Sequence, residues 1–324
     1  MKKLLFVSFY DSSFVRSDIG ILKKHFQVEI LSLANSKRDA FSLLKMIIKI
    51  FWEVFRNDIT YCWFADFSAY LAVKAANLFQ KKVFVVVGGY EVSNLSGYGG
   101  LTDKKRKKRL KYSLTNATRI LTISDFSKAE IDALNFGVDS VKINIGVDRQ
   151  KKVVTKTNTI ITSGSATKEL FKLKGLDIFA KATAGFDDHK IKLIGTFKDE
   201  IKEKLLTYNP HLEFTGKLTH TQFLNELKEA KVYCQFSQRE SFGLALLEAM
   251  NSGCIPVISE AGAMMEILGN TGFSCKYGDV ENARKAIQNA LESDRNDDIL
   301  KRVKENFTID LREEKLIKLI NQEL

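Results

Sequence analysis

Short, uninterrupted apolar runs recur along the chain and alternate with longer amphipathic stretches. Residues 83–87, for example, are Val, Phe, Val, Val and Val, with no polar residue among them. Such runs are typical of strands buried on both faces of a parallel sheet, and helical patterns between them are typical of β-α-β units. We expect strands at residues 3–9, 27–33, 59–64, 82–87, 119–123 and 141–145, and at 159–163, 190–194, 212–214, 231–236, 255–259 and 273–275.

The chain divides into two halves that differ in charge. Its 324 residues suit two domains. Residues 1–150 carry 24 basic and 14 acidic side chains, whereas residues 151–324 carry 26 and 25. The polar stretch Asp148-Arg149-Gln150-Lys151-Lys152 lies between the halves. We therefore predict an α/β protein with domains at 1–150 and 151–308, followed by an amphipathic helix at 309–324.

Cysteine usage and hydropathy exclude several other classes of protein. The four cysteines form no Cys-x-x-Cys pair, which argues against a disulfide framework or a zinc site and favours reduced thiols in a cytoplasmic protein. No apolar run approaches the roughly 18 residues that a membrane span needs. The first ten residues imitate a secretory signal, but Asp11 interrupts the apolar stretch early and no small-residue cleavage site follows. We expect a buried first strand there.

The segment after the expected strand at 231–236 carries the strongest functional signal. It reads Ser237-Gln238-Arg239-Glu240-Ser241-Phe242-Gly243-Leu244-Ala245-Leu246-Leu247-Glu248-Ala249-Met250. We expect a helix that begins near Phe242, with Glu240 before it and Glu248 about two turns further on. The first amides of a helix have no partner within it and bind phosphate well, and Gly243 would let a phosphate approach closely. The two carboxylates would accept hydrogen bonds from hydroxyl pairs, as on a sugar and a ribose.

This pattern resembles a known family. Glu240, seven residues and then Glu248, followed by Ala249-Met250-Asn251-Ser252-Gly253-Cys254-Ile255-Pro256-Val257-Ile258, is similar to the motif of the retaining glycosyltransferases of family 4. Further matching segments are Phe214-Thr215-Gly216, Gly262-Ala263-Met264-Met265-Glu266, Lys174-Gly175-Leu176-Asp177, Leu121-Thr122-Ile123-Ser124 and Asn144-Ile145-Gly146-Val147-Asp148. The resemblance implies the GT-B architecture, in which two Rossmann-like domains face a central cleft. The acceptor would bind to residues 1–150, a nucleotide-sugar would bind to residues 151–308, and the helix at 309–324 would cross back onto the first domain.

The resemblance also assigns roles to single residues. Glu240 would contact the hydroxyls of the donor sugar and Lys174 would neutralise the diphosphate, as the catalytic residues, while Glu248 would hold the nucleotide ribose. Family members usually carry a second cation, often Arg, before that Lys. The stretch here contains no Arg, so Lys168 or Lys172 would take the role, without the bidentate fork of Arg. The other donor-binding residues would be Ser241, Phe242, Gly243, Leu244 and Gly216.

The same resemblance implies a reaction. Family members retain the anomeric configuration, so an α-linked product would form from the usual α-linked donor, a UDP- or GDP-sugar. No carboxylate nucleophile is identifiable on the opposite face, and we expect a front-face mechanism in which the leaving phosphate helps to deprotonate the acceptor. The chain has no Asp-x-Asp motif, which favours catalysis without a metal ion. We expect no cofactor, and a glycan or lipid-linked acceptor in the synthesis of surface glycans or glycolipids.

The acceptor half departs from the family pattern. Many relatives place a His after the fourth strand, but here that strand runs into Gly88-Gly89-Tyr90-Glu91. The four histidines lie elsewhere, and we assign them no role. Gly88 and Gly89 would allow close approach of donor or acceptor, with Tyr90 or Glu91 in a polar role. A tight turn is the alternative explanation.

Two apolar and basic segments suggest a partner for the first half. The run Lys104-Lys105-Arg106-Lys107-Lys108-Arg109-Leu110-Lys111, with residues 43–56, would dock this half on an anionic membrane at the inner face of the cell membrane. A solvated helix face beside an ordinary core helix explains the same pattern.

Other functions stay open at this point. A GT-B nucleotide-sugar epimerase would change its donor without an acceptor, and a catalytically silent protein would only bind the nucleotide-sugar. A nucleic-acid-binding protein would use the basic half, but no stacking-aromatic RNA motif is present, and we expect no nucleic-acid partner.

Overall fold

The protein consists of two compact units. The structure is a computed structural model that describes residues 1–33, 39–95, 98–149, 155–164, 168–294 and 296–324, apart from the side chains of residues 40, 168 and 169. Unit 1 comprises Met1–Gly146 together with Ile309–Leu324, and unit 2 comprises Val147–Thr308. Of the linker expected at residues 148–152, the first two residues belong to unit 2 and the last three lie outside the described part.

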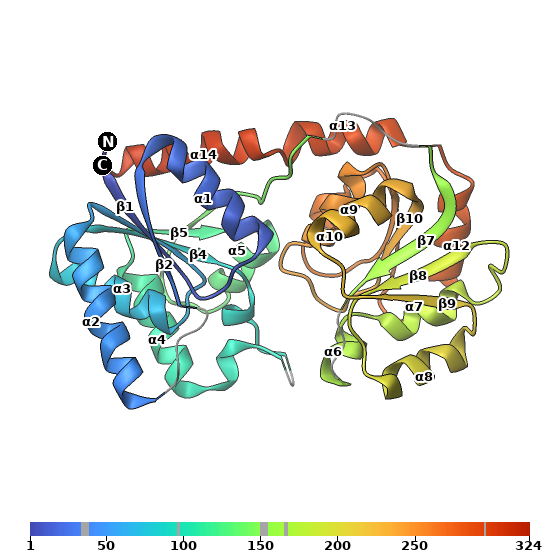
Figure 1. Ribbon diagram of the computed structural model, residues 1–324, viewed down its shortest axis with the longest axis horizontal. Coiled ribbons are helices and arrows are strands. Elements are labelled where there is room, and N and C mark those ends of the chain that lie inside the picture. The colour runs from blue at the N-terminus through green and yellow to red at the C-terminus, as the bar shows by residue number, and fades with distance from the viewer. Residues whose placement is uncertain (34–38, 96–97, 150–154, 165–167, 295) are drawn as a thin grey trace. The chain divides into compact units, whose positions relative to one another are not determined.

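Unit 1 is built on a parallel sheet of six strands in the order β2-β1-β3-β4-β5-β6. The strands are β1 (Lys3–Ser8), β2 (Gln27–Ser32), β3 (Ile59–Trp63), β4 (Lys82–Val87), β5 (Arg119–Thr122) and β6 (Ser140–Lys142). The α-helices are α1 (Ser13–His25), α2 (Ala40–Arg56), α3 (Phe67–Leu78), α4 (Lys104–Asn116), α5 (Asp125–Asp132) and α14 (Ile309–Gln322), with short 3-10 turns η1 (Tyr90–Val92) and η2 (Gly100–Thr102). Helices α2, α3 and α4 lie on one face of the sheet, and α1 and α14 on the other (Figure 1). Residues 83–87 of β4 are all buried, as a strand covered on both faces must be.

A buried ion pair holds helix α14 to the rest of unit 1. The guanidinium of Arg312 pairs with the Asp18 carboxylate through Nε–Oδ1 and Nη2–Oδ2 distances of 2.6 and 2.7 Å. The same carboxylate accepts hydrogen bonds from the Tyr61 hydroxyl at 2.8 Å and from the Trp63 indole at 2.6 Å. The third guanidinium nitrogen donates to the carbonyl oxygens of residues 143 and 144. Every charge in the cluster is therefore compensated, which a buried pair requires.

Unit 2 repeats the architecture with the strand order β12-β11-β10-β7-β8-β9, again all parallel. Its strands are β7 (Thr157–Ser163), β8 (Lys190–Ile194), β9 (Leu212–Gly216), β10 (Ala230–Gln235), β11 (Ile255–Ser259) and β12 (Phe273–Cys275). Its helices are α6 (Lys168–Leu173), α7 (Leu176–Thr183), α8 (Asp199–Tyr208), α9 (His220–Glu229), α10 (Leu244–Asn251), α11 (Met264–Leu268), α12 (Val280–Leu291) and α13 (Asn296–Asn306). The twelve strands expected from the sequence all occur, with ends that differ by at most three residues.

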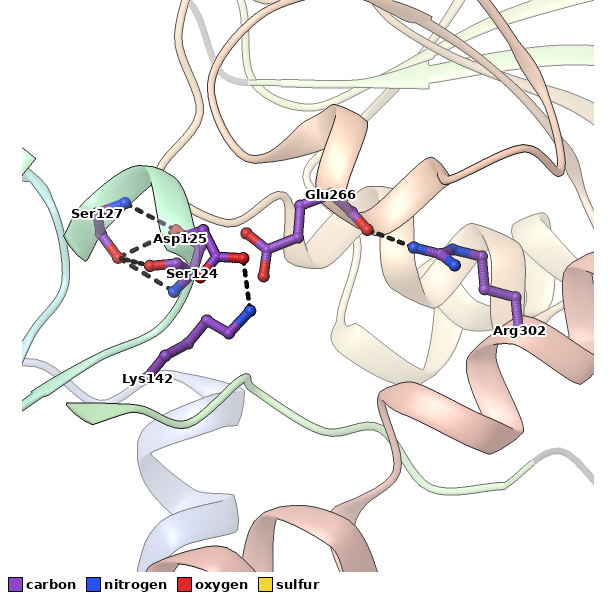
Figure 2. Close-up of polar contacts among 6 residues, drawn as sticks. All are labelled: Ser124, Asp125, Ser127, Lys142, Glu266 and Arg302. Carbon is purple, nitrogen blue, oxygen red and sulfur yellow. Dashed lines mark hydrogen bonds and ion pairs between the residues drawn. The ribbon is translucent and has the colours of Figure 1, made fainter. Parts of the chain in front are cut away.

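Polar side chains fix several helix ends. Ser124 and Ser127 form a reciprocal capping box at the start of α5 (Figure 2). In unit 2, Arg302 Nη2 donates to the carbonyl oxygen of Glu266 at 2.5 Å, and the Glu266 carboxylate points away from that guanidinium (Figure 2). The guanidinium thereby satisfies a carbonyl group near the end of α11.

The four cysteines lie in the interior and form no disulfide. Cys62, Cys234, Cys254 and Cys275 are all free thiols and buried. Within the described ranges, no helix is long and apolar enough to span a bilayer.

Candidate functional site

The carboxyl edge of the unit 2 sheet is where this topology favours a ligand site. Successive strands are added on one side of β7 up to β9, and the chain then returns to place β10 on the other side. Open α/β sheets bind ligands at the carboxyl ends of the strands where the order reverses in this way. Ser163, at the end of β7, shares a 2.8 Å hydrogen bond with the hydroxyl of Tyr233 in β10. The segments that follow these two strands carry Lys174 and Glu240.

The Glu240 carboxylate is held through one of its oxygens. Glu240 Oε1 accepts a hydrogen bond from Lys174 Nζ at 2.6 Å and another from Ser237 Oγ at 2.9 Å. The Glu240 side chain is 15% exposed and that of Lys174 is 32% exposed, so water reaches the ion pair only in part. No residue in the described part of the chain bonds to Glu240 Oε2. That oxygen is available to accept hydrogen bonds from a ligand.

Backbone packing brings Lys174 to Glu240. Gly175, the next residue, has φ +60°, and a Cβ there would lie 1.8 Å from the carbonyl oxygen of Phe236. Only glycine tolerates both conditions. The Gln238 amide donates to the carbonyl oxygen that precedes Lys174, at 2.8 Å. These contacts join the segments after β7 and β10 into one support for the ion pair.

A third loop supports Glu240 from behind. The Ala263 amide donates to the Glu240 carbonyl oxygen at 2.9 Å, and a Cβ on Gly262 would lie 2.2 Å from the same oxygen. The Ser259 hydroxyl, at the end of β11, donates to the carbonyl oxygen of Ser237. The segment at 262–266, which matches a family landmark, therefore fixes the backbone of Glu240 in this chain.

Glu248, on α10, is the second carboxylate of the site. Its Oε1 lies 2.7 Å from Nε2 of His220, the first residue of α9. The Glu248 side chain is 9% exposed, against 46% for His220. Burial raises the pKa of Glu248, and the hydrogen bond and charge of His220 oppose that rise. As at Glu240, no described residue bonds to the second carboxylate oxygen.

The charges of the two carboxylates act on one buried tyrosine of β10. Tyr233 in β10 is fully buried, and burial raises the pKa of its hydroxyl. The hydrogen bond with Ser163 opposes this effect, and the charges of both Glu240 and Glu248 add to it. Both carboxylates therefore lie within electrostatic reach of the Tyr233 hydroxyl.

The start of α10 supplies backbone donors between these carboxylates in the sequence. Gly243 has φ +101°, a left-handed conformation that ends the preceding loop, so the helix begins at Leu244 and not near Phe242 as expected. No side chain caps this end of the helix in the described structure. The amides of residues 244–246 therefore lack intrahelical partners, as at any helix start.

The other residues predicted to bind the nucleotide-sugar lie along the same edge of the unit 2 sheet. Phe242 is 3% exposed and packs edge-on against Phe307, with ring centroids 6.3 Å apart, so only its backbone can face a ligand. Ser241 and Leu244 are half-buried. Gly216, at the end of β9, has φ +72° and open space where a side chain would be.

The structure does not decide between Lys168 and Lys172 as the second cation expected for the diphosphate. The side chain of Lys168 lies outside the described part of the structure. Lys172 is exposed, and its carbonyl oxygen accepts a hydrogen bond from the Tyr277 hydroxyl at 2.8 Å. The assignment of either lysine to the diphosphate stays a prediction.

Sequence reasoning missed two residues of this site, His220 and Ser237. The sequence pattern gives the histidines no role, yet His220 contacts Glu248 directly. A usable signal was present, because Thr219 and Gln222 form a capping box that fixes a helix start directly after β9. A side chain in the first turn after a parallel strand lies at the edge where ligands bind.

The predicted acceptor residues of unit 1 form a loop organised by Glu91. Its carboxylate accepts hydrogen bonds from the amides of Ala65 at 2.9 Å, Gly88 at 3.0 Å and Gly89 at 2.8 Å. A Cβ on Gly88 would lie 2.4 Å from the ring of Phe64. The glycines therefore serve a tight internal turn, and Glu91 has a structural role in it.

The surface of unit 1 carries both segments that suggested a membrane. On α4, residues 104–108 are exposed, and Asp103 caps the helix. On α2, Ile50 and Val54 are buried, but a stripe of large apolar side chains is more than half exposed. The stripe consists of Phe41, Leu44, Ile48, Trp52 and Phe55. Their spacing of three and four residues places them on one face of the helix.

No group of three or more His, Cys, Asp and Glu side chains is arranged to hold a metal ion among the described residues. Catalysis without a metal stays a prediction.

Comparison with known sequences gives one family match and several partial relatives. The model of the family described as "Glycosyl transferases group 1" matches residues 146–307. Sulfoquinovosyl transferase SQD2 of Arabidopsis thaliana is 29% identical over 170 residues, which are 48% of this chain and 32% of that protein. Phosphatidyl-myo-inositol mannosyltransferase of Mycolicibacterium smegmatis is 31% identical over 118 residues, 35% of this chain and 31% of that protein. The chain thus spans about a third of the length of these relatives.

Solved structures match over nearly the whole chain. Sucrose-phosphate synthase of Thermosynechococcus elongatus has a TM-score of 0.82 at 14% identity and covers 99% of both chains. Anabaena Alr3699/HepE in complex with UDP and glucose has a TM-score of 0.78 at 14% identity, over 99% of this chain and 100% of the other. These likenesses confirm the GT-B fold with two Rossmann-like α/β units.

Proposed function

Because this chain belongs to the family of glycosyl transferases group 1, we propose that it transfers a sugar from a nucleoside-diphosphate-sugar to a glycan or a lipid-linked acceptor. Transfer proceeds with retention of the anomeric configuration and without a metal ion. The donor binds at the carboxyl edge of the unit 2 sheet, and it is a UDP- or GDP-sugar.

One observation carries this proposal. Two carboxylates, Glu240 partly exposed and Glu248 buried, lie on either side of the uncapped start of α10 in the sequence, and a basic side chain holds each of them through a single oxygen. The second oxygens of Glu240 and Glu248 are therefore oriented but still able to accept hydrogen bonds. Sugar and ribose both offer adjacent hydroxyl donors, and a diphosphate suits the unpaired amides between them.

The geometry suggests how the residues share the work. The hydrogen bond to Glu240 positions the Lys174 ammonium group, so its charge is in place for the diphosphate before the donor arrives. As the bond between the anomeric carbon and the phosphate oxygen breaks, Lys174 and the α10 amides stabilise the charge of the leaving diphosphate. The acceptor oxygen forms its bond on the same face, and its proton passes to the leaving phosphate oxygen. Glu240 holds the sugar hydroxyls and forms no covalent bond.

The names of similar proteins add support on the substrate classes. The Anabaena protein has been solved with UDP and with UDP-glucose. The first two curated relatives are named for the transfer of sulfoquinovosyl and mannosyl groups, the latter to phosphatidyl-myo-inositol. A lipid acceptor in this chain fits the exposed stripe of α2 and the basic residues of α4. These surfaces would hold the protein at an anionic membrane on its cytoplasmic side.

The direct test is a thermal-shift panel of uridine, guanosine and adenosine diphosphate sugars, each measured with and without a chelator. A true donor raises the melting temperature by mass action, and we expect one base to do so equally in both conditions. The active donor is then incubated alone and its products are separated. Release of an altered nucleotide-sugar would replace the transferase with an epimerase, and no shift with any donor would refute the nucleotide-sugar site.

A further inference from the structure

A cavity of about 630 Å³ opens at the carboxyl edge of the unit 1 sheet. It lies where the strand order of unit 1 reverses, between β1 and β3, the type of place that ligands occupy in open α/β sheets. The segments after β1, β3 and β4 line it, together with residues of α2 and α4. Six aromatic side chains dominate the lining: Phe9, Tyr10, Phe14, Phe64, Phe67 and Tyr90.

Phe64 is the best-fixed of these aromatic residues. Its φ of +71° is costly for a large side chain. The Phe64 amide donates a hydrogen bond to the Val86 carbonyl oxygen at 2.9 Å, which helps to hold this conformation. Gly88 leaves the space that the Phe64 ring occupies. The rings of Tyr10 and Phe14 pack edge-on to it, with centroids 5.1 and 6.2 Å away. The aromatic surface is thus part of the folded unit.

Both acidic groups of the lining accept hydrogen bonds from the protein, Glu91 through both carboxylate oxygens and Asp66 through Oδ1 alone. Asp66 caps α3 and accepts hydrogen bonds from the amides of Ser68 and Ala69 and from the Ser68 hydroxyl. Glu91 accepts hydrogen bonds from three backbone amides, as described above. Burial raises the pKa of both carboxyl groups. Because aromatic rings dominate the lining, they would leave several hydroxyls of a sugar ring unpaired, and an unpaired buried hydroxyl is costly. A hydrocarbon chain has no such cost.

The basic groups of the lining, by contrast, have capacity for an anion. Arg106 and Arg109 lie one turn apart on α4, and neither forms an ion pair within the described part of the chain. The Arg109 guanidinium lies over the Phe67 ring at 4.5 Å, so an edge with its N–H donors remains available. The Ser12 hydroxyl also belongs to the lining, is covered from water, and has no hydrogen-bond partner among the described residues.

We propose that this cavity binds an amphiphile, an apolar chain that carries a phosphate, as the acceptor substrate. The inference rests on the proposed function, because it names the acceptor of that transfer. The aromatic side chains cover the start of the chain, and Arg106 and Arg109 bind the phosphate through charge-assisted hydrogen bonds. Met46 of α2 belongs to the lining, and α2 also carries the exposed apolar stripe, so such a lipid could pass from a bilayer to the cavity along one helix.

Calorimetry with decyl phosphate, below its micelle concentration and without vesicles, tests this assignment. We expect saturable binding, with inorganic phosphate and non-ionic decyl glucoside each at least about tenfold weaker because each lacks one half of the recognised group. The double variant Arg106→Ala/Arg109→Ala should weaken decyl phosphate binding by about tenfold or more. Lys107→Ala/Lys108→Ala removes equal charge from the same helix, outside the lining, and should retain it.

A second double variant tests the aromatic part of the cavity, which would bind the apolar chain of the ligand. Tyr10→Ala/Tyr90→Ala removes two lining rings that are 59% and 45% exposed, so the fold should persist while decyl phosphate binds more weakly. Equal binding of inorganic phosphate or of decyl glucoside would overturn the proposal, and so would an equal loss in the two α4 double variants. A donor-induced thermal shift is measured on the same proteins. If that shift persists while decyl phosphate fails to bind, the acceptor assignment fails and the glycosyltransferase proposal stands.

Discussion

His220 Nε2 and Glu248 Oε1 lie 2.7 Å apart, although 28 residues separate them in the sequence. The imidazole is half exposed and the carboxylate is nearly covered, so the exposed partner fixes the position of the buried one. In this pair and in the Lys174–Glu240 pair, the carboxylate is held through one oxygen, and no described residue bonds to the other.

Glu248→Gln should weaken the binding of the nucleoside diphosphate that the thermal-shift panel identifies. The amide keeps the shape but offers one acceptor oxygen in place of two, and we expect about a tenfold loss of affinity in calorimetry. Glu229→Gln, an exposed change at the end of α9, is the control. Unchanged affinity in a folded Glu248→Gln protein would remove Glu248 from the site.

His220→Ala should move the pH dependence of nucleotide binding. Burial raises the pKa of Glu248 and His220 opposes that rise, so loss of the imidazole raises the pKa further. Because the ionised carboxylate is the better acceptor, affinity should decline as the pH falls and should do so at a higher pH in the variant. Titrations between about pH 5 and 8 measure this, with exposed His211→Ala as control. Superimposable profiles would contradict the coupling of the two side chains.

Lys174→Ala should reduce the affinity for the nucleoside diphosphate by about tenfold and leave the affinity for the parent nucleoside unchanged. The difference arises because the ammonium group contacts only the diphosphate in the proposed complex. Lys190→Ala is a matched control, since Lys190 is exposed at the first position of β8, on the opposite edge of the sheet. Equal losses for nucleoside and diphosphate would show that Lys174 acts on folding or on the nucleoside pocket.

Lys107→Ser/Lys108→Ser/Lys111→Ser should lower the partition of the protein onto vesicles of an anionic phospholipid. The three residues lie on α4, and their attraction to the surface should also weaken as salt is added. Lys301→Ser/Lys304→Ser/Lys315→Ser removes the same charge from exposed positions of α13 and α14. A sedimentation assay compares the two, and equal partition would reject α4 as the membrane surface.

Arg312→Ala should destabilise unit 1 by about 3–5 kcal/mol, because it leaves the buried Asp18 carboxylate without its cation. Urea unfolding measures the loss of unfolding free energy. The control Lys315→Ala, at an exposed position of the same helix, should change that free energy little. A small change in the Arg312 variant would mean that Tyr61 and Trp63 are sufficient to compensate Asp18.

The strands and the carboxylate motif were readable from the sequence because both are local. A run such as residues 82–87 has no polar position to place in water, so it must be covered on both faces, and β4 has the predicted bounds. Glu240 and Glu248 are tied to one loop and one helix, and Gly243 marks the helix start between them, although only the structure shows that this glycine lies outside the helix.

The partners of those carboxylates were not readable, because they come from distant segments. Lys174 and Glu240 are 66 residues apart, and no spacing rule connects them. The same holds for the cavity of unit 1, whose aromatic side chains follow three different strands and look like ordinary strand ends in the sequence.

The amino-acid order alone thus determined two α/β units and the segment that carries the carboxylates, since hydrophobic period and glycine placement act over a few residues. Only the tertiary structure decided which cation holds each carboxylate and which aromatic rings share a cavity. Parallel strands bring their carboxyl ends to one edge whatever their separation along the chain, and chemistry assembled at that edge has no signature in spacing.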